Sequence, residues 1–144
     1  MEAARAVSRR DERAAGKLRD LLRSVGLRAT LPRLKVLRRL DDSTAPVSHA
    51  DLARELVPLG FDRATVYRNL NDLVDAGLAT RVELGGNVWR FESRSAETGH
   101  PHFLCKRCGE VVCLAEVDVQ LPNPGRRQIG DIEDVVLRGR CSSC

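Results

Sequence analysis

The chain has 144 residues, of which 42% are hydrophobic and only 3% aromatic, so one or two small domains can form around aliphatic side chains. No apolar run reaches the roughly 18 residues of a membrane span, and the arginine-rich N-terminus lacks a signal-peptide pattern, so we expect a cytoplasmic protein. The net charge is +4, but residues 1–39 hold twelve Lys and Arg against four Asp and Glu. This basic third favours nucleic acid as a partner, although a solvated helix face has a similar composition.

Four helices are expected in the first half of the chain. Residues 1–10 are expected to form a flexible basic arm, and residues 11–25 carry apolar side chains at helical spacing. Three further helices are expected to begin after Thr30, Ser48 and Asp62, because these residue types cap helix N-termini.

The fourth helix is followed by two β-type runs, Leu78–Leu84 and Val88–Glu92, joined by a Gly-Gly-Asn turn. Helices followed by one hairpin predict a winged helix-turn-helix domain over residues 1–92. The small, polar residues 93–99 are expected to form a hinge to a second domain, residues 100–144. Further strand-like segments lie at 101–105, 110–114 and 132–138. The expected fold class is therefore α+β.

All five cysteines lie after residue 104, and four of them form the pairs Cys105-x-x-Cys108 and Cys141-x-x-Cys144. Two thiolates at this spacing grip one tetrahedral ion, and a second pair completes its coordination. Four sulfurs leave no open position, so we expect a structural Zn²⁺. A redox dithiol or buried free cysteines are the alternatives, but paired Cys-x-x-Cys motifs in a cytosolic chain favour zinc.

A second metal constellation is suggested by His100 and His102, which point to the same side if they lie on a strand. Glu92 at the end of the hairpin and Cys113 on the next strand could complete the set. Such a Glu/His/His/Cys site suits Zn²⁺ or Fe²⁺. The alternative is that the histidines are exposed polar residues and Cys113 is a small core residue.

The fourth helix carries the side chains expected to read DNA. Arg68 lies opposite its apolar face and can contact a guanine edge, and Tyr67 on the flank can contact thymine or phosphate. Further candidate DNA contacts are Arg63, Arg28, Arg33, Thr65 and Asn71. A solvated helix surface is the alternative. We find no nucleophile or general-base constellation, so the chain is not expected to be an enzyme.

Several motifs, in this order, resemble the ferric uptake regulator family over roughly residues 18–144. They are Gly26–Thr30 with Arg33, Ala64–Leu70, Ala76–Leu78, His100–Gly109 and Gly139–Cys144. The Thr-Val-Tyr-Arg and His-x-His-x-x-Cys-x-x-Cys-Gly runs are the most specific of them.

The resemblance implies a homodimer with an N-terminal winged helix and a C-terminal α/β dimerisation domain holding a four-cysteine zinc. By motif position, Glu92, His100 and His102 match regulatory metal ligands, Tyr67 and Arg68 match the DNA-contacting pair, and Cys113 stands where many members have a carboxylate.

Metal at the regulatory site is implied to set the angle between two DNA-binding domains, so that both reach one palindromic double-stranded operator. We therefore expect a metal-dependent regulator, most members being repressors, that senses Zn²⁺ or Fe²⁺ and controls metal homeostasis genes. A peroxide- or thiol-responsive regulator of the same fold is the alternative.

The chain departs from the family pattern at several positions. Pro46 stands where members usually place a ligand histidine, and His49 follows three residues later. Pro101 and Arg140 replace ligands of a further metal site, so that site is expected to be absent. The segment between Leu114 and Ile132 is short, so the dimerisation helix is expected to be truncated.

Overall fold

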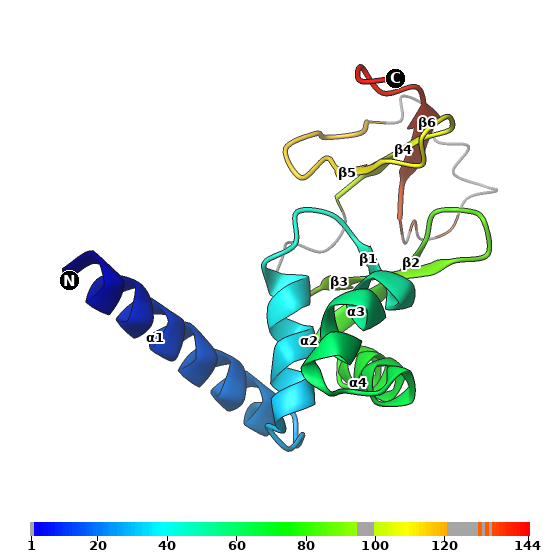
Figure 1. Ribbon diagram of the computed structural model, residues 1–144. Helices are drawn as coiled ribbons and strands as arrows, with labels where there is room; N and C mark the ends of the chain where they lie inside the picture. Colours follow the sequence, from blue (N-terminus) through cyan, green and yellow to red (C-terminus); the bar gives the residue numbers. More distant parts are fainter. Residues whose placement is uncertain (1, 95–99, 121–129, 131, 133) are drawn as a thin grey trace.

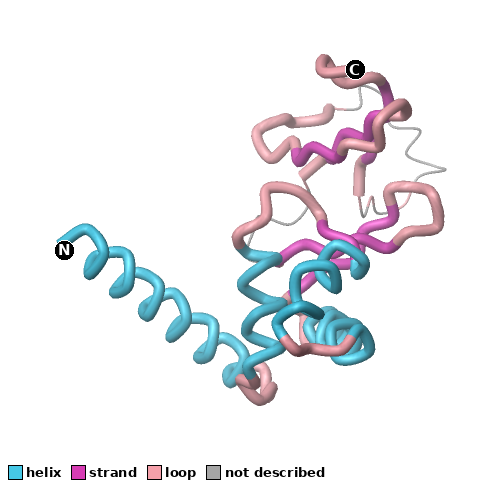
Figure 2. Tube along the Cα trace, in the orientation of Figure 1, coloured by secondary structure: helices cyan, strands magenta, loops and turns pink. Residues whose placement is uncertain are grey.

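The computed structural model describes residues 2–94, 100–120, 130, 132 and 134–144, which form two lobes (Figure 1). Most of the predicted hinge lies outside the described residues, and so does most of the segment between Leu114 and Ile132, where a truncated dimerisation helix was expected. Four helices and a small sheet make the first lobe, and a second sheet makes the other (Figure 2). No helix among the described residues is long and apolar enough to cross a membrane.

The helices of the first lobe follow the predicted order. They are α1 (Glu2–Ser24), α2 (Leu31–Asp41), α3 (His49–Leu56) and α4 (Arg63–Asp75), with a short 3-10 turn η1 (Val57–Leu59) after α3. The first helix differs from expectation, because it extends to Glu2 and replaces the flexible arm expected over residues 1–10. Alanine, arginine and glutamate dominate that stretch, and they favour a helix.

Two of the predicted caps determine where α3 and α4 begin. Ser48 accepts a hydrogen bond from the Asp51 backbone N–H at 3.1 Å, and the Asp51 carboxylate accepts one from the Ser48 N–H at 3.2 Å, which completes a capping box. Asp62 accepts from the Thr65 N–H at 2.7 Å. Thr30 precedes α2 but makes no such side-chain bond.

The predicted hairpin is present as β2 (Ala79–Glu83) and β3 (Trp89–Ser93), which pair in antiparallel register. A two-residue strand that the sequence did not predict, β1 (Val47–Ser48), joins the other edge of β3. Phe91 on β3 is 1% exposed and packs with the buried side chains of all four helices. The core contains Leu22, Leu37, Leu52, Val66, Leu70 and Leu73, among others.

The second lobe is a three-stranded sheet in the order β5-β4-β6. Its strands are β4 (His102–Cys105), β5 (Val111–Cys113) and β6 (Val136–Gly139). The last strand pairs parallel to β4 and begins at Val136, later than predicted. The register sets His102 opposite Cys113 on one face, because cross-strand partners share a face.

The hairpin of the first lobe lies against the second lobe. Leu84, at the end of β2, is 2% exposed although it stands outside the main core cluster. A Cβ built on the next residue, Gly85, would lie 3.9 Å from Leu104 of β4 and 3.8 Å from Arg138 of β6. This contact brings β3, with Glu92, toward the second sheet.

Candidate metal centres and DNA-binding surface

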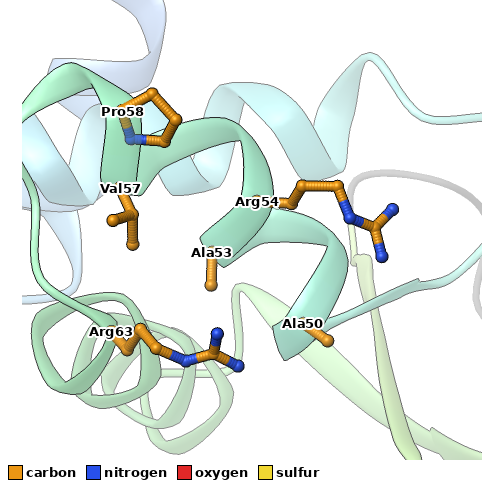
Figure 3. Close-up of a pocket in the computed structure, with 6 residues that line it drawn as sticks. All are labelled: Ala50, Ala53, Arg54, Val57, Pro58 and Arg63. Carbon is orange, nitrogen blue, oxygen red and sulfur yellow. The ribbon is translucent and has the colours of Figure 1, made fainter.

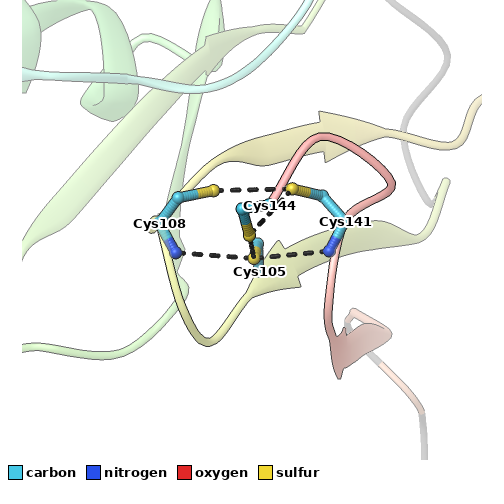
Figure 4. A group of neighbouring side chains, drawn as sticks. All are labelled: Cys105, Cys108, Cys141 and Cys144. Carbon is cyan, nitrogen blue, oxygen red and sulfur yellow. Dashed lines mark hydrogen bonds between the residues drawn. The ribbon is translucent and has the colours of Figure 1, made fainter.

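Four cysteine side chains converge where the turn after β4 meets the last residues of the chain (Figure 4). The Sγ–Sγ distances are 3.4 Å for Cys105–Cys144, 3.6 Å for Cys108–Cys141 and 3.3 Å for Cys141–Cys144. Two sulfurs on one tetrahedral zinc, at ~2.3 Å each, are about 3.8 Å apart. All five cysteines are free. The two pairs therefore fit a single zinc ion with four cysteine ligands.

The backbone around Cys105 favours a negatively charged sulfur. The N–H groups of Cys108 and Cys141 donate to Cys105 Sγ at 3.5 and 3.4 Å, and these bonds lower the pKa of Cys105 to about 5. Hydrogen bonds with the thiols of Cys141 and Cys105 raise the pKa of Cys144 to about 12. Four sulfurs this close cannot all lose their protons without a cation to balance their charge, and a divalent metal would supply it.

A second cluster lies between the two lobes. The Oε2 atom of Glu92, on β3, is 3.0 Å from Nε2 of His102 and 3.3 Å from Nε2 of His100. The two imidazole rings have centroids 4.8 Å apart. The Cys113 sulfur and one ring nitrogen of each histidine all lie within 4.8 Å of one another. The fold thus brings together the four residues singled out from the sequence.

This second cluster is shielded from water. The side chains of His100 and His102 are 6% and 3% exposed, and that of Glu92 is 20% exposed. Burial, and then the charge of Glu92, raise the pKa of the Cys113 thiol. Nδ1 of His102 is buried with no hydrogen-bond partner among the described residues, and Nε2 of the same ring faces Glu92. A donor set of nitrogen, oxygen and sulfur fits a divalent transition metal.

The first turns of α4 present the pair expected to contact DNA. Tyr67 is 48% exposed, and Arg68 is exposed with its Nη2 3.4 Å from the Thr65 hydroxyl. The Asp62 carboxylate accepts from both the N–H and the hydroxyl of Thr65, and these bonds lower the pKa of Asp62. One carboxylate thus caps α4 and holds the threonine that contacts Arg68.

Of the three arginines named as further candidate DNA contacts, Arg28 and Arg63 are exposed. Arg33 is more buried than these two. Its side chain is 14% exposed, pairs with Asp72 on α4, and donates to the Arg28 carbonyl at 2.8 Å. Arg33 therefore joins α2 to α4, and its contact with DNA stays a prediction.

Two residues near α4 were not recognised from the sequence as part of this surface. His49 lies away from both metal clusters, with its Nε2 2.9 Å from the Arg63 carbonyl. Arg81, on β2, donates to the Asn71 side chain at 2.7 Å. Each contact joins two segments that are separated in the sequence. In the sequence itself, His49 and Arg81 appear only as polar residues beside apolar runs, and that pattern does not indicate their partners.

A hollow of about 330 Å³ lies between α3, η1 and the start of α4 (Figure 3). Its walls are mostly small apolar side chains, with Arg54 and Arg63 at the rim; Arg63 extends across the hollow and Arg54 points away from it. The lining contains no carboxylate, imidazole or thiol. This hollow therefore offers no general acid, general base or nucleophile.

A winged helix joined to a small sheet with a four-cysteine cluster is an architecture of transcription regulators. The chain belongs to the ferric uptake regulator family, whose profile matches residues 24–127. Proteins of this family are transcription regulators and not enzymes.

Known relatives agree with this assignment. The ferric uptake regulation protein of Vibrio parahaemolyticus is 43% identical over 94 residues, which are 63% of this chain and 62% of that protein. The chain thus matches less than two thirds of the length of that relative.

Solved structures of the family share the fold. The ferric uptake regulator of Vibrio cholerae matches with a TM-score of 0.64 and 31% identity, over 85% of this chain and 98% of that one. The regulator of Pseudomonas aeruginosa, solved with manganese, matches with a TM-score of 0.60 and 29% identity, over 85% and 96% of the two chains. The predicted α+β class and family are thereby confirmed.

Proposed function

We propose that this chain is a metal-dependent, DNA-binding transcription regulator, a repressor when loaded, that controls metal homeostasis genes. One observation carries the proposal: Glu92 of the winged-helix lobe meets His100 and His102 of the second lobe in a shielded cluster. A cation held there by residues of both lobes binds the docked arrangement better than an open one, and so shifts the population toward it. Residues 1–92 form the DNA-binding part, 93–99 the hinge and 100–144 the dimerisation part.

The zinc of the four-cysteine cluster is structural in this proposal. Cys105, Cys108, Cys141 and Cys144 provide four sulfurs, so no position is left for a substrate or an effector. The site ties the end of the chain to the turn after β4. Metal binding there contributes directly to the stability of the second lobe.

The regulatory cation is held by Glu92, His100, His102 and Cys113. The Cys113 thiolate favours Zn²⁺ over Fe²⁺, because sulfur ligands bind zinc well. His49 is not part of this set, because its ring nitrogen contacts the Arg63 carbonyl. When bound, the metal supplies positive charge that neutralises Glu92 and Cys113 and joins the two lobes.

A homodimer is supported by an apolar row on the far face of the second sheet. Phe103 lies directly between Val112 and Leu137, and these two neighbours are 38% and 40% exposed. A second copy would cover this row, because exposed apolar rows of this kind mark interfaces. Two copies of α4 would then read the halves of a palindromic double-stranded site, with Tyr67 and Arg68 at the bases.

The alternative is a peroxide- or thiol-responsive regulator of the same fold, in which the Cys113 thiol or an iron ion at the site is oxidised. Reactive thiols have a lowered pKa, whereas burial and the charge of Glu92 raise the pKa of Cys113. The metal-dependent function is therefore preferred, and peroxide treatment of the loaded protein separates the two. DNA affinity that follows added Zn²⁺ or Fe²⁺ and does not change with peroxide would exclude the alternative, whereas loss of DNA binding on peroxide treatment would favour it.

The experiment that tests the proposal is a DNA-binding titration with Zn²⁺ and with Fe²⁺ against duplexes selected in vitro with the metal-loaded protein. The wild type is expected to bind only when metal is added, and His102→Ala is expected to lose this response while keeping one zinc per chain. Cys113→Asp is expected to reduce the preference for Zn²⁺. A metal response that persists in His102→Ala would refute the regulatory site.

A further inference from the structure

The outer part of the β2–β3 hairpin carries an aromatic and cationic pair beside α4. Register places Arg81 opposite Phe91 and Glu83 opposite Trp89, so all four share one face of the hairpin. Phe91 is covered by the helices, whereas Trp89, two residues nearer the turn, is 48% exposed. The face that packs on the helices therefore extends past them into solvent.

Arg81 connects this overhang to α4. Its Nη2 donates to Asn71 Oδ1 at 2.7 Å, and its guanidinium carbon lies 5.1 Å from the Trp89 ring centroid, a cation–π contact. Asn71 follows Arg68 by three residues, so the two lie on the same side of α4. An exposed strip therefore continues from Arg68 through Asn71 to Arg81 and Trp89.

We propose that Arg81 and Trp89 form a second DNA-contacting surface, which binds the phosphate–deoxyribose backbone beside the bases faced by α4. This inference rests on the proposed DNA-binding function. Arginine has five N–H donors, and the bond to Asn71 uses Nη2, so the same side chain can also donate to a phosphate. The half-exposed indole packs against deoxyribose. Glu83 shares the face, two residues beyond Arg81 on β2.

Such contacts position a protein on the duplex without reading its sequence. They also explain why the large apolar ring of Trp89 is half-exposed to solvent beside the Arg81 guanidinium. A protein partner on the same patch is the competing occupant. It is less favoured, because the strip is continuous with the α4 side chains that face DNA.

The test uses the intact, metal-loaded protein, because Trp89 is the one tryptophan of the chain and its emission reports this surface alone. Acrylamide quenching of tryptophan emission is measured with and without an unlabelled mixed-sequence DNA duplex at low salt. Binding is followed separately by the anisotropy of a labelled duplex. Quenching is expected to fall in step with binding.

Two outcomes separate this inference from the function on which it rests. If anisotropy reports binding while quenching is unchanged, the hairpin does not contact DNA and this inference alone is overturned. If no duplex, mixed or selected, changes the anisotropy, the DNA-binding function and the inference both fail.

A variant provides the second measurement. Arg81→Ala is expected to reduce the slope of log K against log salt by about 1 and to weaken binding equally for all sequences. Arg140→Ala, an exposed arginine of the second lobe, is the matched control and is expected to leave the slope unchanged. An unchanged slope in a folded Arg81→Ala protein would overturn the inference.

Discussion

His49 packs edge-on against Tyr67, with ring centroids 5.3 Å apart and planes at 70°. The Nε2 of the same imidazole donates to the carbonyl of Arg63, one turn earlier on α4. A residue at the start of α3 thus contacts both the backbone and an exposed aromatic side chain of α4. His49 lies three residues after Pro46, where the family resemblance implies a ligand histidine, and its two contacts join α3 to α4.

We expect His49→Ala to weaken specific DNA binding by about 1 kcal/mol, or about five-fold, because one hydrogen bond and one ring contact are lost. Fluorescence anisotropy with a selected duplex measures the change. His49→Gln retains an N–H donor and should recover part of the affinity. The affinity for the regulatory metal should be unchanged in both variants; a parallel loss of metal affinity would make His49 a ligand.

Arg68→Ala is expected to cost about 1–3 kcal/mol of specific binding and to relax sequence preference at one position of each half-site. The Arg68 guanidinium is exposed and lies 3.4 Å from the Thr65 hydroxyl, one turn earlier on α4. Competition between selected and mixed-sequence duplexes measures the loss. Arg140→Ala serves as the control. An equal loss of affinity for both duplexes would indicate that Arg68 contacts phosphate and does not read a base.

Cys105→Ser is expected to remove the structural zinc and unfold the second lobe, because the buried Cys105 sulfur accepts two backbone hydrogen bonds and contacts Cys144. Zinc content per chain and thermal unfolding followed by circular dichroism measure both effects. The helical lobe keeps its own core and should retain its signal. Cys113→Ser is the matched control, and it should keep the structural zinc.

Leu137→Glu is expected to convert the proposed dimer to a monomer, since it places a charge in the apolar row beside Phe103. A buried, uncompensated charge costs ~3–5 kcal/mol. Sedimentation velocity reports the oligomeric state. The control is Leu59→Glu, a 61% exposed leucine of the helical lobe. If Leu137→Glu remains dimeric, the interface lies elsewhere.

Local sequence patterns predicted most of the elements. The Ser48 and Asp62 caps, the apolar spacing of α4 and the glycine-rich turn each act over a few residues, so they are visible without a structure. The same patterns did not reveal β1, because a two-residue strand has no periodicity of its own. They also did not reveal the full length of α1, whose N-terminal part lacks an apolar stripe.

The two candidate metal sites also differ in how much of each can be predicted from local sequence patterns. Spacing within each Cys-x-x-Cys confines two ligands to one turn, so the sequence by itself determined the two pairs. The parallel pairing of β6 with β4 brings the two pairs together. The sequence named Glu92 and Cys113 as ligands but could not determine that they meet. Their approach to His102 depends on β4–β5 register and on the docking of the hairpin against the second lobe.

The polar surface of α4 was decided by tertiary structure alone. Arg33, His49 and Arg81 have the same exposed, hydrophilic character in the sequence, yet they pair with Asp72, Tyr67 and Asn71 respectively. Short-range chemistry determines helices, turns and paired cysteines. Which distant polar groups meet depends on the packing of a core whose geometry no local pattern contains.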